Sequence, residues 1–247
     1  MPAYNAEKTL RTAYDEVVAQ GVVDTVIIVD DCSSDGTEEV AKGLGSGAPG
    51  GRALPTIVYR RHERNRGYGG NQKSCYRLAL EAGADIIVMV HPDCQYTPKL
   101  LVPMVAMIAE GLHPCILASR ILGGYALKGG MPIWKYVSNR FLTASMNLLF
   151  GSKLSEFHTG YRAFSSDLLR RLPLDANIDD FAFDAQMLAE ILWTKATIGE
   201  VSCPTVYTDE ASSINFVRSC KYGLGCLWVG LVYRLCKFKL AKSRLFR

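Results

Sequence analysis

The sequence predicts an α/β protein in which helices flank a mostly parallel central sheet. Short apolar runs bounded by turn residues alternate with helical patterns up to about residue 120, and this alternation is typical of parallel sheets. The chain has 247 residues, of which 49% are hydrophobic and 21% charged. Such a chain can form one domain with a substantial core, and its composition excludes disordered and fibrous proteins.

The predicted elements follow one another in strict alternation through this first part of the chain. Glycine ends several of the helical patterns, because it allows the left-handed backbone that closes a helix. Helices are expected over 8–20, 38–42, 72–82 and 98–110, and strands over 25–29, 56–59, 86–90 and 115–119. Residues 60–71 are polar and rich in glycine, so we interpret them as a turn.

The pattern changes after residue 120. Four glycines bracket residues 123–130, which we expect to form a mobile loop. Helices are expected over 134–150, 167–172, 179–193 and 216–240, and one more strand over 197–201. We divide the chain into an α/β domain of residues 1–214 and an apolar, basic C-terminal helix or tail of residues 215–247.

Composition excludes several classes of protein. The net charge of +4 is too small to indicate a nucleic-acid partner. The eight cysteines show neither a CxxC pair nor zinc spacing, so we expect reduced thiols and a cytoplasmic protein. Neither a secretory signal nor an apolar run of ~20 residues is visible. No predicted strand runs into a G-x-G-x-x-G loop, which argues against an NAD enzyme.

The C-terminal tail predicts a contact with a membrane surface. After Glu210 the sequence contains basic residues and no acidic ones. Apolar side chains lie among these lysines and arginines, as in a helix that lies on an anionic bilayer. They are Trp228, Val229, Leu231, Val232, Tyr233 and Leu235. This interpretation places the protein at the inner face of the membrane. A terminal helix packed on the core explains the pattern equally well, and the sequence leaves both open.

The apolar run over 86–90 is followed at once by Pro92, Asp93, Gln95 and Tyr96. In open α/β sheets ligands bind beyond the carboxyl ends of such strands. Carboxylate and amide oxygens are ligands for hard cations, which complete their coordination with water and substrate phosphate. We therefore predict a divalent-metal site here. A simple turn that prepares the next helix is the alternative.

A second acidic turn, with Asp30 and Asp31, follows the strand over 25–29. Carboxylates crowded in one crevice repel one another, so the two turns together imply a cation or a ligand rich in hydrogen-bond donors. A nucleotide diphosphate with Mg²⁺ or Mn²⁺ satisfies this requirement. Helix capping at an exposed turn is the alternative for Asp30 and Asp31.

Five short motifs occur in the order in which one family carries them. They are Pro2-Ala-Tyr-Asn5, Val29-Asp-Asp-Cys-Ser-Ser-Asp-Gly-Thr37, Asn65-Arg-Gly-Tyr-Gly69, His91-Pro-Asp-Cys-Gln95 and Thr159-Gly-Tyr-Arg162. With them the chain resembles the family 2 glycosyltransferases of the GT-A fold, nearest to the dolichyl-phosphate mannose synthase and polyprenyl-phosphate glycosyltransferase group. The resemblance extends to about residue 214. It implies inverting transfer of a sugar from a UDP- or GDP-sugar to a polyprenyl phosphate, or to a lipid or glycan hydroxyl, with Mg²⁺ or Mn²⁺.

The resemblance also implies roles for individual residues. The donor nucleotide would be bound by Pro2, Tyr4, Glu7, Val29, Asp31, Asp93 and Arg120. The metal would be held by Asp93, Gln95 and His91, and the catalytic residues would be Asp93, Asp184 and Arg162. His91 stands where the family motif has its first Asp, and imidazole suits Mn²⁺ better than Mg²⁺.

Two of these roles have structural alternatives. Arg162 can hold a phosphate bidentately, or it can form a structural ion pair with Asp180 or Asp184. Asp184 can act as a general base towards a hydroxyl acceptor, whereas a phosphate acceptor is already ionised and requires none. A carboxylate favoured by the dipole at a helix N-terminus is the structural interpretation of Asp184.

The sequence departs from the family in two places. Residues 208–213 replace an arginine that grips phosphate in the synthases, and the family's first strand would precede Pro2. We therefore expect either a longer gene product or another segment in the place of that strand. These departures keep a rival hypothesis open, in which the protein binds a nucleotide sugar, or serves as a scaffold, without turnover.

Overall fold

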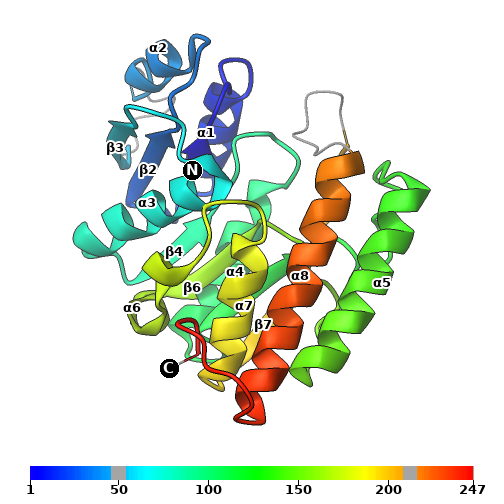
Figure 1. Ribbon diagram of the computed structural model, residues 1–247. Helices are drawn as coiled ribbons and strands as arrows, with labels where there is room; N and C mark the ends of the chain where they lie inside the picture. The colour runs from blue at the N-terminus through cyan, green and yellow to red at the C-terminus, as the bar shows by residue number, and fades with distance from the viewer. Residues whose placement is uncertain (46–53, 208–215, 247) are drawn as a thin grey trace.

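The computed structural model describes residues 1–45, 54–207 and 216–246. Strands and helices alternate, as the sequence predicts (Figure 1). The strands are β1 (Pro2–Ala3), β2 (Thr25–Asp30), β3 (Thr56–Arg61), β4 (Ile86–Met89), β5 (Cys115–Ser119), β6 (Arg162–Ser165) and β7 (Ile198–Ser202). The α-helices are α1 (Leu10–Ala19), α2 (Thr37–Lys42), α3 (Gly67–Glu81), α4 (Leu101–Ala109), α5 (Ile133–Phe150), α6 (Ser166–Arg171), α7 (Phe183–Trp193) and α8 (Phe216–Lys237).

The strands form two sheets that are parallel except at one strand. The first has the order β1-β2-β3, with all neighbours parallel. The second has the order β4-β6-β5-β7, and β6 runs antiparallel to both β4 and β5. The prediction of an α/β fold is confirmed, but β6 was missed. Its four residues lie inside a motif and carry a buried arginine, so no apolar run marked it as a strand.

The place of the N-terminal strand is taken by two residues. β1 pairs with β2 through Pro2 opposite Val29 and Ala3 opposite Asp30. The amino group of Met1 donates to the carbonyl of Ile27 at 2.8 Å, which extends this pairing by one residue. No other described strand pairs with β1. The expectation that the chain lacks a strand before residue 4 is thus corrected, because Pro2–Ala3 pairs with β2.

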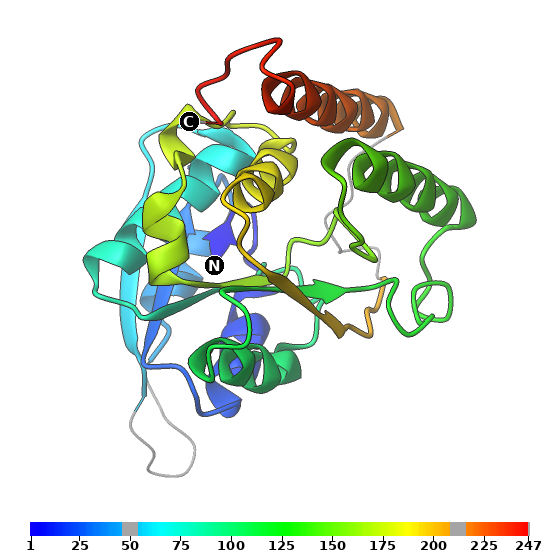
Figure 2. The same ribbon diagram turned by 90° about the horizontal axis from the view of Figure 1, so that it is seen from below.

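Helices cover both faces of the sheet (Figure 2). α1 and α4 pack on one face with one hydrophobic cluster, which includes Leu10 and Met104. The larger cluster lies on the other face, where α3, α6 and α7 contribute residues such as Tyr76 and Phe183. α5 and α8 lie side by side on that same face and contact each other.

Helix α8 packs on the core along one side and is exposed along the other. Val229 and Tyr233 are buried in the larger cluster, whereas Trp228 is 65% exposed and Leu231 is also exposed. The two interpretations of the tail therefore apply to opposite sides of one helix. No helix in the described part of the chain is long and apolar enough to cross a bilayer. The division at residue 214 stays a prediction.

Helix α3 begins five residues earlier than the sequence indicated, so the predicted turn is wrong over its last residues. Gly67 has a φ of 80°, which a residue with a side chain rarely adopts. A Cβ at Gly69 would lie 2.6 Å from the carbonyl oxygen of Ile178. The glycines that suggested a loop instead allow α3 to approach the segment before α7.

Candidate active site

Two adjoining cavities lie beyond the carboxyl ends of β2 and β4. The β1–α3 cavity, of about 760 Å³, is lined by residues of β1 and α3 and by Asp31. The α5–α8 cavity, of about 600 Å³, is lined by residues of those two helices. Five residues line both cavities, namely Tyr68, His91, Asp93, Phe181 and Tyr222. A ligand that spans the two would pass these side chains.

Asp31 is fixed by the N-terminus of α3. Its Oδ1 accepts from Nδ1 of His62 at 2.7 Å and from the amide of Arg66 at 2.8 Å. Its Oδ2 accepts from the amide of Gly67 at 3.0 Å. Asp31 is nearly buried, yet it lines the β1–α3 cavity. Because a carboxylate oxygen accepts more than one hydrogen bond, Oδ2 has capacity for a ligand.

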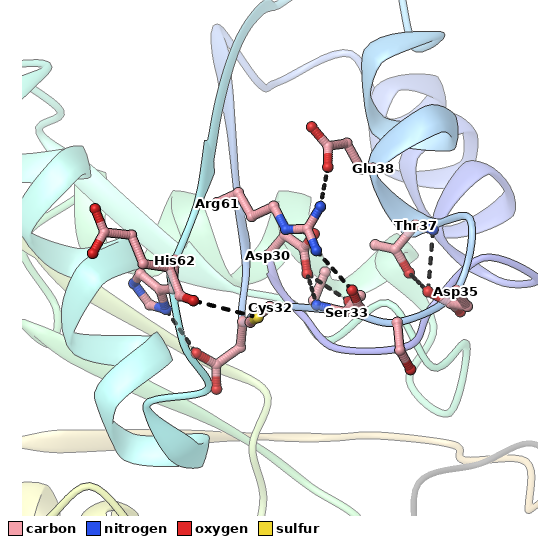
Figure 3. Close-up of polar contacts among 12 residues, drawn as sticks. Asp30, Cys32, Ser33, Asp35, Thr37, Glu38, Arg61 and His62 are labelled. Atoms are coloured by element: carbon pink, nitrogen blue, oxygen red, sulfur yellow. Dashed lines mark hydrogen bonds and ion pairs between the residues drawn. The ribbon is translucent and has the colours of Figure 1, made fainter.

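Neighbouring polar contacts stiffen the turn between β2 and α2 (Figure 3). Arg61 donates to the carbonyl of Ser33 at 2.9 Å and pairs with Glu38. The Thr37 hydroxyl and Asp35 are hydrogen-bonded. Ser33 in turn donates to the buried carboxylate of Asp30. The capping alternative is wrong for Asp30, which is fully buried and bonded within the turn, while the N-cap of α2 is Gly36 without a side-chain cap. Asp31 lines the cavity.

The seven residues predicted to bind the donor nucleotide do not all line the same cavity. Pro2, Tyr4, Asp31 and Asp93 line the β1–α3 cavity. Arg120 lines the α5–α8 cavity instead. Two others line neither, and both have local structural contacts.

Glu7 and Val29 are the two that lie away from the cavities. Glu7 accepts from the amide of Gly36 at 3.1 Å, and a Cβ at Gly36 would lie 2.8 Å from its carboxylate carbon. Val29 is fully buried in β2, and its carbonyl accepts from the side chain of Asn71 at 3.1 Å. Their contact with a nucleotide stays a prediction.

Asp93 occupies the junction of the two cavities. Its Oδ1 accepts from the amide of Gln95 at 3.1 Å, which closes a turn around Cys94 at a φ of 53°. Gln95 is nearly buried and lines the α5–α8 cavity. The strand-to-turn placement that the sequence predicted is therefore what the structure shows for these two residues.

His91 stacks on Tyr68, with ring centroids 5.5 Å apart and an interplanar angle of 8°. Its Nε2 lies 3.4 Å from the Tyr68 hydroxyl. A Cβ at Gly160 would lie 2.8 Å from this Nε2, so the glycine makes room for the ring. Burial lowers the pKa of His91, which keeps the imidazole neutral. Of its two nitrogens, Nδ1 is the one not turned towards Tyr68.

The donor set fits a divalent cation that shares its coordination with a substrate. The described residues contain no group of three or more His, Cys, Asp or Glu side chains arranged for a metal. Asp93 and Gln95 nevertheless offer a carboxylate and an amide oxygen beside a cavity. Mg²⁺ is usually bound through one or two carboxylates and substrate phosphates rather than by an all-protein cage. The residues therefore suit a cation that arrives with a diphosphate.

Arg162 and Asp184 form the ion pair that the sequence left as an alternative. Nη1 of Arg162 lies 3.5 Å from Oδ1 of Asp184, and its guanidinium also donates to three carbonyl oxygens. Arg162 is fully buried and lines neither cavity. Oδ2 of Asp184 accepts from the hydroxyl of Tyr68 at 2.8 Å. A direct catalytic role for Arg162 stays a prediction, and its contacts are those of a positioning residue.

Arg120 is held by Glu156, which the sequence analysis missed. Nε and Nη2 of Arg120 donate to Oε1 of this fully buried carboxylate, and Nη1 donates to the Tyr207 hydroxyl at 3.1 Å. Burial raises the pKa of Glu156, but the charge of Arg120 outweighs it, so the net pKa lies below the ordinary value. An acidic residue shortly before the Thr159 motif was the available signal.

Basic residues of α8 also face the site. Arg218 and Lys221 line the β1–α3 cavity, and Lys221 pairs with Asp180 at 3.4 Å. The sequence analysis assigned this basic character to a membrane surface. Their approach to β1 depends on how α8 packs across the fold, which no local pattern reveals.

A family model described as "Glycosyl transferase family 2" matches residues 1–172. The chain belongs to glycosyltransferase family 2. The two cavities lie where the fold of such an enzyme presents its loops, beyond the carboxyl ends of parallel strands.

Characterised relatives cover almost the whole chain. The UDP-N-acetylglucosamine–dolichyl-phosphate N-acetylglucosaminyltransferase of Methanococcus voltae is 28% identical over 248 residues, which is 98% of this chain and 95% of the relative. The undecaprenyl-phosphate mannosyltransferase of Micrococcus luteus is 24% identical over 253 residues, covering 95% and 97%. This glycosyltransferase is therefore most usefully compared with enzymes named for polyprenyl phosphates.

Solved structures share the fold. Glucosyl-3-phosphoglycerate synthase from Mycobacterium tuberculosis in complex with phosphoglyceric acid superposes with a TM-score of 0.65 at 19% identity, covering 98% of this chain and 79% of that one. Its complex with Mn²⁺, UDP-glucose and phosphoglyceric acid gives a TM-score of 0.63 at 18% identity, with the same coverage. The predicted GT-A fold is confirmed.

Proposed function

We propose that this family 2 glycosyltransferase moves a sugar from a nucleotide diphosphate in the β1–α3 cavity to a polyprenyl phosphate in the α5–α8 cavity. The observation that carries the proposal is the shared position of Asp93, which lines both cavities. A transferred group must pass from donor to acceptor at one point. Asp93 lies at that point and carries a carboxylate oxygen that makes no described hydrogen bond.

The β1–α3 cavity suits a nucleotide diphosphate. Asp31 offers an oriented acceptor for a base or ribose N–H or O–H, and Tyr4 offers an aromatic ring. Arg218 and Lys221 supply positive charge for phosphates. A relative is named for UDP-N-acetylglucosamine, and the structural neighbour was crystallised with UDP-glucose. We therefore take a UDP- or GDP-sugar as the donor.

A divalent cation, Mg²⁺ or Mn²⁺, held by Asp93 and Gln95 would neutralise the charge of the departing diphosphate. His91 contributes at most through Nδ1, because its Nε2 is turned towards Tyr68. The protein's own part is to orient the donor through Asp31 and to exclude water at the junction through the stacked rings of Tyr68, His91 and Phe181.

The reaction follows from this arrangement. An acceptor oxygen attacks the anomeric carbon from the face opposite the diphosphate, the bond from that carbon to the diphosphate oxygen breaks, and the configuration inverts. A phosphate acceptor fits better than a hydroxyl. Oδ2 of Asp184 is engaged by Tyr68, and its Oδ1 lies near Gln72 and Arg162, so this carboxylate is poorly placed to take a proton. An ionised phosphate oxygen needs no base.

The exposed sides of α5 and α8 support contact with a membrane at the cytoplasmic face. Leu224 and Trp228 of α8 are 69% and 65% exposed, and Phe141 of α5 is 64% exposed. A lipid acceptor would reach the α5–α8 cavity across this surface.

Liposomes with anionic lipid should retain the protein, and Leu224→Ser with Trp228→Ser should weaken retention several-fold. Leu112→Ser, at an apolar residue 61% exposed and remote from both helices, is the control and should not weaken it. Equal retention of all variants would exclude the surface.

Turnover separates this proposal from the rival of a non-catalytic binding protein. The wild-type protein with Mn²⁺ and a UDP-sugar should transfer sugar to a polyprenyl phosphate, and Asp93→Ala should abolish the transfer. The rival has one observation in its favour, the stacked His91 in place of a carboxylate. Nucleotide binding without transfer or donor hydrolysis, tested with UDP- and GDP-sugars, would support the rival.

A further inference from the structure

Among the described residues that line the α5–α8 cavity, some cationic and donor side chains are engaged by protein groups and others are not. The guanidinium of Arg120 donates to Glu156, to Tyr207 and to the carbonyl of His158. Asn139 donates to the same Glu156 at 2.8 Å. The ammonium of Lys135 makes no ion pair with a described residue, and Nε2 of His158 is buried without a described partner.

Lys135 lies in the first turn of α5 and is half-buried in the cavity wall. Its Nζ lies 5.5 Å from the ring centroid of Trp134. No carboxylate in the described residues lies within ion-pair distance of this Nζ. Burial lowers the pKa of Lys135, and the nearby charge of Arg120 lowers it further. The ammonium of Lys135 thus lies near a second cation, Arg120, and only Arg120 is paired with a described carboxylate.

His158 presents the second group. Its Nδ1 lies 2.7 Å from the hydroxyl of Tyr222 on α8, and the two rings are nearly perpendicular. Its Nε2 is buried and has no partner among the described residues. Burial lowers the pKa of His158 to about 4, so the ring is neutral and carries a single proton.

The tautomer follows from the chemistry of this pair. A phenol is a good hydrogen-bond donor, and the unprotonated imidazole nitrogen is a good acceptor. Burial raises the pKa of Tyr222, so its hydroxyl keeps the proton that it donates to Nδ1. Nε2 of His158 then carries the N–H. A buried donor without an acceptor is destabilising, so this site favours a ligand that supplies an acceptor oxygen.

We propose that Lys135 and His158 together bind the terminal phosphate of the acceptor. This inference rests on the proposed function, because it names the groups that hold the acceptor for that reaction. Lys135 supplies the charge, and the Nε2–H of His158 supplies a directed hydrogen bond. The positive end of the α5 dipole lies at the same place, since Lys135 is in the first turn. The apolar walls, with Phe141, Leu142 and Leu227, accommodate the chain behind the phosphate.

The chemistry that the site recognises is a phosphate monoester on an apolar chain. Inorganic phosphate shares the head group, and the corresponding alcohol shares the chain. Binding of farnesyl phosphate, farnesol and inorganic phosphate to the intact protein therefore distinguishes the head group from the chain. Calorimetry measures this binding without turnover, so it tests the two residues even if sugar transfer fails.

The test uses paired variants. Lys135→Gln and His158→Leu should each weaken farnesyl phosphate binding about 10–100-fold, the range of a lost charge-assisted hydrogen bond. Lys135→Arg keeps the charge and should restore most of the affinity, and His158→Gln keeps an N–H donor and should do the same. Lys128→Gln is the control. Its Nζ also lies over a ring, 5.7 Å from the Tyr125 centroid, but it lines neither cavity.

Kinetics give an independent readout. With donor saturating, the KM for farnesyl phosphate should rise in Lys135→Gln and His158→Leu and should stay at the wild-type value in Lys128→Gln. Unchanged farnesyl phosphate affinity in both variants would overturn the proposal, and so would an equal loss for farnesol and farnesyl phosphate. A wild-type protein that binds farnesyl phosphate through these residues but never transfers sugar would refute the proposed function alone.

Discussion

The two cavities are built in different ways. The β1–α3 cavity is formed at strand ends, where backbone amides and short turns fix Asp31 and Asp93. The α5–α8 cavity lies between two helices that are far apart in the sequence, and its walls are largely apolar. The comparison teaches that a site built from strand-end turns can be located from local motifs, whereas a site between packed helices depends on tertiary structure.

The largest effect is expected at the buried ion pair of Arg162 and Asp184, of which Asp184 lines the α5–α8 cavity. Arg162→Met would leave Asp184 buried without its cation, and it would leave three carbonyl oxygens without their donor. Breaking a buried pair in this way costs about 3–5 kcal/mol. Urea denaturation should show a fall of that size in the free energy of unfolding. Arg140→Met, at an exposed arginine bonded to one carbonyl, is the control and should change little. Equal urea midpoints for Arg162→Met and the wild type would show that the stability of the fold does not depend on this pair.

The next effect separates the two cavities kinetically. Asp31→Ala should raise the KM for the nucleotide sugar about 10–100-fold, because a charged hydrogen-bond acceptor is lost. The KM for the acceptor should stay constant, since Asp31 does not line the α5–α8 cavity. Asp175→Ala, at an exposed residue paired with Arg77, is the control. A rise in both KM values would contradict the division of the site.

The stability of the fold is expected to depend on pH through Glu190 of α7, whose partner Asn177 precedes Ile178 in the lining of the β1–α3 cavity. Burial raises the pKa of Glu190 to about 8, and its Oε2 accepts from Asn177 at 3.3 Å. The folded protein therefore keeps a proton that the unfolded chain releases near pH 4.5. The free energy of unfolding should fall as the pH rises between these values, by at most about 1.4 kcal/mol per unit.

Glu190→Gln tests this dependence. The amide keeps the shape of the side chain but binds no proton in this range, so the fall in stability from pH 5 to pH 8 should become shallower. Urea denaturation at several pH values measures the difference. Parallel curves for the variant and the wild type would show that Glu190 is ionised in the folded protein.

The smallest effect concerns the apolar wall. Phe141→Ser should raise the KM for a long polyprenyl phosphate a few-fold and leave that for farnesyl phosphate nearly unchanged, because the exposed ring lies on the outer part of α5. Leu148→Ser, on the same helix but outside the cavity lining, is the control. Equal changes for both chain lengths would place the chain elsewhere.

Four of the predicted donor residues, Pro2, Tyr4, Asp31 and Asp93, line the first cavity. Asp31 and Asp93 follow strands whose apolar pattern was clear, whereas Pro2 and Tyr4 were expected from the family resemblance. Their contact with a nucleotide stays a prediction.

The family's first strand was expected to be absent, but Pro2 and Ala3 pair with β2. A strand of two residues leaves no apolar pattern in the sequence. Glu7 lines neither cavity, and its side chain accepts from the amide of Gly36 in the turn between β2 and α2. Its contact with a nucleotide stays a prediction.

The second cavity shows what the sequence could not provide. Whether Arg162 faces a phosphate or Asp184 depends on the antiparallel position of β6, which was not anticipated. Lys135 and His158 carry no motif, and they become neighbours of Arg120 only through the packing of α5 and α8. A missing arginine in residues 208–213 was a prediction that lies outside the described residues. The family resemblance therefore predicted the family and the fold, whereas the contacts of an acceptor stay a prediction.

The account depends most directly on Asp93 as the point where cation, donor and acceptor meet. Electron paramagnetic resonance of Mn²⁺ in the presence of UDP, or of GDP if UDP does not bind, tests this in the intact protein without turnover. The wild-type protein should bind about one Mn²⁺ only when the nucleotide is present, and Asp93→Asn should weaken this binding at least about tenfold while the nucleotide alone still binds. Mn²⁺ binding of equal affinity in both proteins would contradict the account.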